Sequence, residues 1–513
     1  MSDLVIGSGP AGVSVARALL ARGRNVTMLD AGVEPGPGVT DRVQQMSRTR
    51  AEDWSAEART AWMEPQFQAL EGEVWRYGSG YALASPARTL AEGADWFALR
   101  ASRAAGGLSN VWGAAVLPYR QADIDDWPIT TDDLAPHYSA VADIMPVSGQ
   151  KDGLQDLFPA CDMTGRTPIP PTAQAEMLLA RSRQKAKALQ GVGMHVGLAR
   201  QAVGPGCQTC GLCLHGCPWS LIWSARQART TLQAEPGFTY RADHVVRQVR
   251  EEGDDVVVTL ADGSDIRGNR VFLAAGVLES ARILLASPGL RGKELVLKDS
   301  QQAFLPMLHR WRAPRRPDVL PYQTLPQLFA ELDDPTVSRQ LVHAQIYTWN
   351  EYYARDLKQN YGRRIPGSGP LLEALARRLI VAQVFLHSDH SHEIALRLAE
   401  DGRLRPELNE NPATAETMRA ALARYGRALR GLGLTSLSFA ARFGAPGASF
   451  HVGGDLPMSD DPGPGESDVL GRPHGATRIH VVDASVLPTI PATTITFSVM
   501  ANAHRIGTLA PEA

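Results

Sequence analysis

The residues best suited to redox chemistry are four cysteines within eleven positions of the chain. Cys207, Cys210, Cys213 and Cys217 are followed by Pro218, and this spacing is that of a known iron–sulfur ligand run. Thiolates at these intervals can converge on a cubane. Because the sequence holds no second run, either all four bind one 4Fe-4S cluster, or three bind a 3Fe-4S cluster and one is spare. We expect the 4Fe-4S arrangement.

Two other uses of these cysteines stay open. Zinc commonly takes two pairs of ligands separated by a longer loop, which four cysteines in so short a segment do not provide. Disulfides need an oxidising compartment, and we expect no secretory signal ahead of the apolar run that begins at Leu4. The fifth cysteine, Cys161, stands apart and is expected to be a buried apolar residue.

A glycine-rich turn near the N-terminus predicts a dinucleotide site. Gly7 permits a tight turn, Gly9 lets the backbone approach a pyrophosphate, and Gly12 allows a helix to pack closely on a strand. Pro10 and Ala11 open that helix, whose unpaired N–H groups and dipole favour the negative charge of phosphates. We therefore expect the phosphates of a dinucleotide at this turn.

The elements around the turn have the order that such a site requires. Residues 4–6 and 26–29 are apolar runs that we expect to be neighbouring parallel strands. The second run ends at Asp30, roughly 20 residues past the glycines, where a carboxylate can accept hydrogen bonds from a ribose. Strand, turn, helix, strand and acid together predict a Rossmann-like α/β domain.

The composition is that of an ordinary globular protein, and its charge does not indicate a highly charged partner such as nucleic acid. Lys and Arg number 52 and Asp and Glu number 54, so the net charge of -2 gives no reason to expect nucleic acid. The apolar stretch 271–285 is interrupted by Glu279 and Arg282, and no run of about 18 uncharged apolar residues exists. We expect a cytoplasmic protein without a membrane span.

Several later segments resemble the glucose-methanol-choline (GMC) oxidoreductases, a family of FAD enzymes. The segments follow the family's order and approximate spacing. They are a glycine–serine loop, a "DWP" segment, a second signature and a closing motif: Gly106-Gly107-Leu108-Ser109, Asp126-Trp127-Pro128 with Leu134-Ala135-Pro136-His137-Tyr138, Ala275-Gly276 through Glu279-Ser280-Ala281, His451-Val452-Gly453-Gly454 and Val482 to Pro488.

The resemblance implies FAD as the dinucleotide, bound by a Rossmann-like domain that is joined to a second, α+β substrate domain built on an antiparallel sheet. We expect residues 1–120, 200–300 and 451–513 to form the FAD-binding domain, with the cysteine loop at 204–220, and residues 121–199 and 301–450 to form the substrate domain. Further FAD-binding residues are expected at Gly106, Gly107, Ser109, Asn110, Trp112, Val246, Ala275 and Asp483.

The family's chemistry is abstraction of hydride from a carbon that bears a hydroxyl group, while a histidine takes the hydroxyl proton. His451 matches that position, and an imidazole with a pKa near 6.5 suits a general base. The family's second catalytic residue is His or Asn, about eleven residues before an Arg of the final helix. Counting back from Arg505 places Thr494 there, whose hydroxyl can orient a substrate but is a poor base.

These features predict an FAD-dependent dehydrogenase that oxidises an alcohol or sugar hydroxyl to a carbonyl. The cysteine cluster would lead electrons towards an acceptor protein. Two alternatives stay open. One is an oxidase of the same family whose cysteine loop is purely structural, and the other is a redox-silent, flavin-bound isomerase or scaffold, which Thr494 keeps in consideration. The substrate, the acceptor and the oligomeric state are not decided by the sequence.

Overall fold

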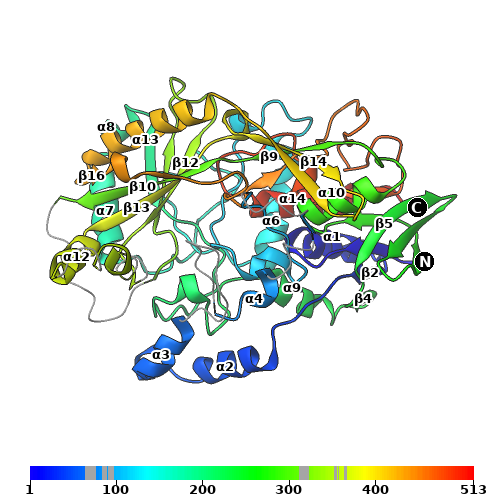
Figure 1. The fold of residues 1–513 in the computed structure, drawn as a ribbon, viewed down its shortest axis with the longest axis horizontal. Helices are drawn as coiled ribbons and strands as arrows, with labels where there is room; N and C mark the ends of the chain where they lie inside the picture. The colour runs from blue at the N-terminus through cyan, green and yellow to red at the C-terminus, as the bar shows by residue number, and fades with distance from the viewer. Residues whose placement is uncertain are drawn as a thin grey trace.

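The computed structural model has two lobes that lie side by side along its long axis, with both chain ends in one of them (Figure 1). The residues that it describes are 1–63, 77–83, 89–90, 97–310, 323–351, 355, 357–362 and 367–512. Parts of the expected FAD-binding domain between residues 64 and 96, and residues 311–322 of the expected substrate domain, lie outside these ranges.

The lobe with the chain ends is built on a parallel sheet. Within the described residues its strands run in the order β19-β8-β1-β2-β4, and every neighbouring pair is parallel. Residues of β1 are all buried, as expected for a strand that is covered on both faces. This sheet confirms the Rossmann-like part of the predicted fold. The strands are β1 (Asp3–Ile6), β2 (Val26–Leu29), β4 (Phe238–Arg241), β8 (Val271–Leu273) and β19 (Ile479–Val481).

Two helices from opposite ends of the chain pack together on this sheet. Helix α1 (Pro10–Ala21) contacts the final helix α14 (Thr496–Leu509). The crossing is close, because a Cβ atom added at Gly507 would lie 2.9 Å from the Cβ of Ala18. Helix α6 (Thr131–Ile144) packs on the other side of α14. The chain ends therefore join to complete one core.

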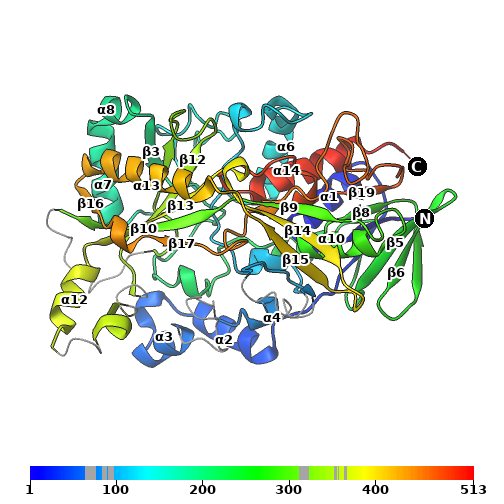
Figure 2. The same ribbon diagram turned by 45° about the horizontal axis from the view of Figure 1, so that its top comes forward.

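The second lobe is built on a larger antiparallel sheet. Its strands follow the order β16-β10-β13-β12-β11-β3, and β17 also pairs with β10, as far as the chain is described. Helices α7 and α13 cover one face with apolar side chains (Figure 2). These elements are β3 (Met194–Leu198), β10 (Gln302–His309), β11 (Leu328–Leu332), β12 (Val342–Tyr347), β13 (Leu379–Phe385), β16 (Leu434–Ser436), β17 (Arg442–Phe443), α7 (Ala173–Gln184) and α13 (Thr414–Arg430).

Two smaller sheets lie against the first lobe. The order β15-β14-β9-β18 forms one, and the meander β5-β6-β7 forms the other. The remaining elements are β5 (Val246–Glu252), β6 (Asp255–Leu260), β7 (Asp265–Gly268), β9 (Leu295–Asp299), β14 (Glu393–Leu398), β15 (Leu404–Asn409), β18 (Val452–Gly453), α2 (Pro37–Ser47), α3 (Ala56–Met63), α4 (Gly80–Leu83), α8 (Ala186–Gln190), α9 (Ala225–Leu232), α10 (Val277–Ala286) and α12 (Gly369–Ala376).

The apolar packing bears on the predicted domain boundaries. Leu134 of α6, Ile394 of β14 and Leu404 of β15 belong to the same buried cluster as the parallel sheet. All three lie in segments that the predicted division assigns to the substrate domain. The division by residue ranges stays a proposal, and these segments are where packing departs from it. No helix in the described part of the chain is both long and apolar enough to cross a membrane.

Candidate functional site

A large cavity opens at the carboxyl end of the parallel sheet, around the first glycine turn. It encloses about 1280 Å³, part of it open to solvent, which suits a large organic ligand. The predicted FAD-binding residues that line it are Gly7, Gly9, Pro10, Ala11, Asp30, Gly107, Val246, Ala275 and Asp483. The predicted residues Gly12, Gly106, Ser109, Asn110 and Trp112 are not among the residues that line it, and Ser109 and Asn110 line a second cavity instead.

The three glycines of the turn differ in what surrounds them. Gly7 has φ +98°, and a Cβ there would lie 2.5 Å from the carbonyl oxygen of Ala274. At Gly12 a Cβ would lie 2.0 Å from the carbonyl oxygen of Gly7. At Gly9 nothing lies within 4 Å, so that backbone faces the open cavity. The arrangement leaves the N-terminus of α1 accessible to a phosphate.

Asp30 sits at the end of β2 and joins three segments of the cavity wall. Its carboxylate accepts hydrogen bonds from the hydroxyl of Ser8 and, at 3.1 Å, from the hydroxyl of Tyr240. Burial raises the pKa of Asp30 to about 6, although these two hydroxyls and Arg229 act in the opposite direction. The Ser8 hydroxyl in turn accepts from the backbone N–H of Gly106 at 2.9 Å. Ser8, which the sequence did not single out, therefore ties the two glycine loops together.

The second glycine loop is held by its own polar side chains. Gly107 approaches the first turn so closely that a Cβ added there would lie 3.7 Å from the Cα of Gly9. The hydroxyl of Ser109 donates to the carbonyl of Gly106 at 2.6 Å, and Asn110 donates to the carbonyl of Gly107 at 2.8 Å. Trp112 donates from its indole to a backbone carbonyl at 2.8 Å. These residues shape the loop that faces the cavity.

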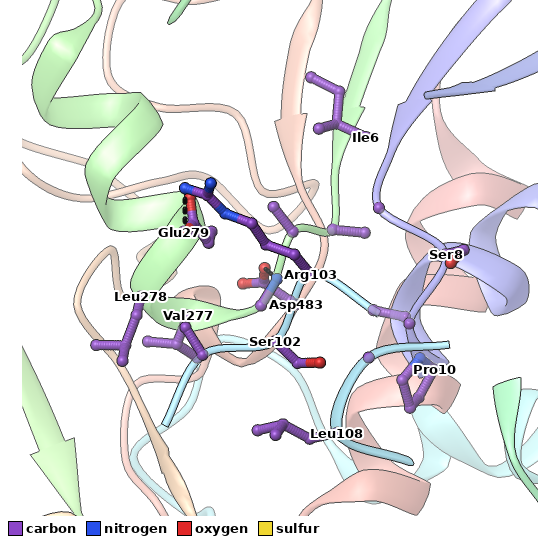
Figure 3. A pocket seen from close by; sticks show the side chains of 18 of the residues that line it. Ile6, Ser8, Pro10, Ser102, Arg103, Leu108, Val277, Leu278, Glu279 and Asp483 are labelled. Carbon is purple, nitrogen blue, oxygen red and sulfur yellow. Dashed lines mark hydrogen bonds and ion pairs between the residues drawn. The ribbon is translucent and has the colours of Figure 1, made fainter. Parts of the chain in front are cut away.

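Arg103 and Glu279, two charged residues of the cavity wall, were not predicted as site residues from the sequence. Arg103 pairs with Glu279 at 3.3 Å, as Figure 3 shows, and Arg282 pairs with the other oxygen of Glu279 at 2.7 Å. Burial raises the pKa of Glu279, but its two arginine partners and Thr89 outweigh burial and lower it overall. Glu279 stands in the second signature segment, so its position carried a signal, whereas Arg103 lies in a loop without one.

Two buried carboxylates, Asp483 and Asp455, lie near each other at another part of the cavity wall. Asp483 lines the cavity and accepts from the backbone N–H of Gly276 at 3.0 Å and from the hydroxyl of Ser280 at 2.5 Å. Burial raises the pKa of Asp483, and burial together with the nearby charge of Asp483 raises the pKa of Asp455 to about 7. Asp455 was not expected from the sequence.

His451 lies next to the cavity, between two residues that line it, Phe450 and Val452. Its ring stacks on Phe385 with 4.9 Å between centroids, and burial lowers its pKa to about 3. Its Nδ1 is buried and has no hydrogen-bond partner in the described part of the protein. Phe450 has φ +61°, a conformation that a non-glycine residue rarely adopts, so the turn before His451 is strained. The imidazole is thus neutral and uncommitted.

The predicted second catalytic residue is already engaged. The hydroxyl of Thr494 accepts a hydrogen bond from the backbone N–H of Leu117 at 2.8 Å. Its neighbour Thr493 differs, because its buried hydroxyl has no partner among the described residues. Counting residues could not separate these two adjacent threonines. The hydrogen bonds favour Thr493 as the hydroxyl that is free to meet a ligand.

Comparison with known proteins identifies the segment that carries these residues. A family model described as GMC oxidoreductase matches residues 397–503, which include His451, Asp483 and Thr494. The chain carries a GMC oxidoreductase C-terminal domain. The predicted resemblance is therefore confirmed, and with it the class of enzyme, an oxidoreductase, for which the GMC family implies FAD.

Two solved structures share the overall GMC fold. Pyridoxine 4-oxidase from Mesorbium loti is 15% identical, with 99% of this chain and 98% of that chain covered and a TM-score of 0.61. A fungal aryl-alcohol oxidase is likewise 15% identical over 99% of this chain and 98% of that one, with a TM-score of 0.55. At this identity the likeness confirms the mixed α/β fold. No curated protein matches the chain in sequence.

The cysteine loop surrounds a cavity of its own. Cys207, Cys210, Cys213 and Cys217 all line one small apolar cavity of about 380 Å³. Burial raises the pKa of Cys207 to about 11 and of Cys210 to about 12, and the other thiols of the loop add to the effect. Among the described residues, no group of three or more histidine, cysteine, aspartate or glutamate side chains is arranged to hold a metal ion. The lone Cys161 is buried in the main core.

Proposed function

We propose that this chain is an FAD-dependent dehydrogenase that oxidises an alcohol or sugar hydroxyl to a carbonyl. The observation that carries the proposal is the position of His451, a half-buried imidazole with a lowered pKa beside a large cavity. His451 also lies within the segment that is similar to the GMC oxidoreductases, which supports the proposal. The names of the two structural neighbours, a pyridoxine oxidase and an aryl-alcohol oxidase, agree with chemistry at a hydroxyl-bearing carbon.

The residues around the cavity fit FAD. Gly9 leaves room for a pyrophosphate at the N-terminus of α1, and Asp30 can accept hydrogen bonds from the adenosine ribose. Gly107, Ala275 and Asp483 line the remaining wall. Bound there, FAD would supply a two-electron acceptor for hydride from the substrate carbon.

His451 is suited to take the hydroxyl proton of the substrate. A general base must be unprotonated, and burial keeps this imidazole neutral at every pH above about 3. Its unpartnered Nδ1 offers a lone pair or a proton, according to the tautomer, without breaking an existing hydrogen bond. Thr493 or Thr494 would position the substrate oxygen, and the free hydroxyl of Thr493 favours the former.

We further propose a 4Fe-4S cluster at Cys207, Cys210, Cys213 and Cys217. The support is that the four cysteines, one buried and three partly buried, all line one cavity, in the ferredoxin-like spacing. A cubane binds each thiolate through a different iron, so its ligands surround a volume instead of meeting at one point. The cluster would supply a one-electron route to an acceptor protein, which oxygen-using enzymes do not need.

The second candidate is an oxidase whose cysteine loop is purely structural. It is favoured by the two neighbours, which are named as oxidases, and by the lack of an arranged metal-ligand group in the described residues. Iron and acid-labile sulfide analysis of protein purified without air separates the candidates. Near-stoichiometric iron and sulfide supports the cluster, and their absence at full flavin content contradicts it.

The proposed activity is tested by an anaerobic screen of alcohols, polyols and sugars against the bound flavin. We expect at least one hydroxyl compound to bleach the flavin absorbance, and the broad iron–sulfur absorbance to change in the same trace. A flavin that no hydroxyl compound bleaches would favour the redox-silent alternative.

A further inference from the structure

The antiparallel sheet of the second lobe has one face that is polar and yet buried. On the helix-covered face, strand β12 presents Val342, Ala344 and Ile346 to the apolar core. The alternate residues His343 and Gln345 point to the opposite face, and they are 0% and 5% exposed. Buried polar groups normally have partners, so a buried polar face implies a ligand or a neighbouring segment that provides them.

A carboxylate and an imidazole stand directly opposite each other on this face. Glu331 of β11 and His343 of β12 are cross-strand partners, and Nδ1 of the histidine lies 2.8 Å from Oε1 of the glutamate. Both side chains are 0% exposed. A carboxylate only accepts hydrogen bonds, so Nδ1 is the donor of this pair, and Nε2 is the ring nitrogen left for a further partner such as a hydroxyl, which can both donate and accept. Glu331 therefore fixes the tautomer and the orientation of His343.

The pair is connected to the proposed catalytic base through one aromatic ring. His343 is also the cross-strand partner of Phe385, with 5.9 Å between their ring centroids. Phe385 in turn stacks on His451 at 4.9 Å, and the nearby His343 contributes to the lowered pKa of His451. The imidazoles of His343 and His451 therefore both stack on the ring of Phe385.

Both members of the pair keep an uncommitted acceptor. Nε2 of His343 and Oε2 of Glu331 are buried and have no hydrogen-bond partner in the described ranges. We propose that His343, oriented by Glu331, binds a second hydroxyl group of the substrate, which makes the substrate a diol, polyol or sugar. This inference rests on the proposed oxidation of a hydroxyl group.

The surroundings favour a hydroxyl over an ammonium group as the donor. Gln345, Gln383 and Gln302 stand on neighbouring strands of the same face, and carboxamides both donate and accept, as hydroxyls do. Arg200 is 0% exposed and interacts electrostatically with Glu331, so a positive charge already faces that carboxylate. A second cation would be superfluous there.

The test compares substrates that differ by one donor group. Anaerobic flavin reduction is measured with 1-propanol, 1,3-propanediol, 3-amino-1-propanol and glycerol, and with D-glucose and its monodeoxy analogues. In His343→Leu we expect the apparent Kd of compounds with the second hydroxyl to rise about tenfold or more, because a buried hydrogen bond is lost. The Kd of 1-propanol and the limiting reduction rate should change less than about threefold.

The chain offers a matched control in the other lobe. His480 is also 0% exposed and stacks on a phenylalanine, Phe272, with 4.9 Å between centroids. His480→Leu removes an equally buried imidazole away from the polar face, so it should leave the ratio of polyol to 1-propanol affinity unchanged. An equal loss for all compounds in His343→Leu, or a preference for the amino alcohol, overturns the proposal.

A second variant decides the matter should His343→Leu fail to fold. Glu331→Gln keeps the side-chain volume but can donate to Nδ1, which moves the ring proton to Nε2 and removes the acceptor. Polyol affinity should fall while 1-propanol affinity holds, and an unchanged polyol affinity contradicts the role of the pair. If no compound reduces the wild-type flavin, the proposed function itself is contradicted. Polyol binding is then followed by perturbation of the flavin spectrum, so the role of His343 is decided separately.

Discussion

The dinucleotide cavity and the cysteine loop of this protein are built in different ways. The dinucleotide cavity is formed largely by backbone, because Gly7 and Gly12 have no room for a side chain and Gly9 faces open space. The cysteine loop is formed by side chains, since four thiols line a cavity whose other lining residues, apart from Gln208 and Gly216, are apolar. A backbone-built site is complete in the folded chain, whereas the cysteine loop would be completed only by the proposed cluster. The reaction end beside the flavin cavity, at His451, also depends on a side chain.

The largest effect is expected at that side chain. His451→Ala should retain FAD, because its ring does not line the cavity, but lose flavin reduction by substrate by about 10²- to 10⁴-fold, the contribution typical of a general base. The measurement is the anaerobic reduction rate at saturating substrate, normalised to flavin content. Undiminished reduction would remove His451 from the mechanism and leave this region without a known base.

The next largest effect is expected in the glycine turn, where one glycine has no room for a side chain and another has room for one. Gly12→Ala forces a Cβ to 2.0 Å from the carbonyl of Gly7, so the backbone must shift, at a cost of about 1–3 kcal/mol or more in the free energy of unfolding. FAD should be lost with it. Gly9→Ala is the matched control, since no atom lies within 4 Å of the added methyl group.

Gly9→Ala should therefore keep the unfolding transition and weaken only FAD binding. Thermal unfolding of both variants, with FAD retention after gel filtration, makes the comparison. Equal stability of the two would mean that the turn adapts to a side chain, and the cavity would then not be fixed by backbone packing.

A smaller effect is expected from the buried acidic pair. The pKa of Asp455 is raised from 3.8 to about 7, so as pH rises from 3.8 the unfolded chain loses this proton before the folded chain does. Stability is therefore lost between these values, and the loss is complete above pH 7. Asp455→Asn should stabilise the protein by about 1–3 kcal/mol at pH 8 and by less at pH 5. Denaturant unfolding at both pH values measures this, and a larger gain at pH 5 would contradict the assigned direction.

The sequence predicted the elements whose positions follow from the spacing of apolar residues and glycines. The runs at 4–6 and 26–29, expected to be neighbouring parallel strands, lie within β1 and β2, which pair in parallel. Sequence reasoning did not find Ser8, Arg103 or Asp455, because their roles arise from neighbours more than twenty residues away in the chain. Likewise, the difference between Thr493 and Thr494 depends on one hydrogen bond from Leu117, a contact across 377 positions.

The smallest effect concerns the pH dependence of the reaction. An ordinary histidine, with a pKa of about 6.5, would lose about nine-tenths of its neutral form by pH 5.5. Burial lowers the pKa of His451 to about 3, so the base stays neutral throughout this range. We expect kcat/KM to lack an acid limb between pH 8 and about pH 4 that is due to this group. Flavin content is checked at each pH, because Asp30 and Asp455 titrate near pH 6 and 7. An acid limb near pH 6.5 at constant flavin content would mean that water reaches His451 when substrate binds. The pKa of this residue would then not be determined by the folded chain alone, unlike the backbone packing of the glycine turn.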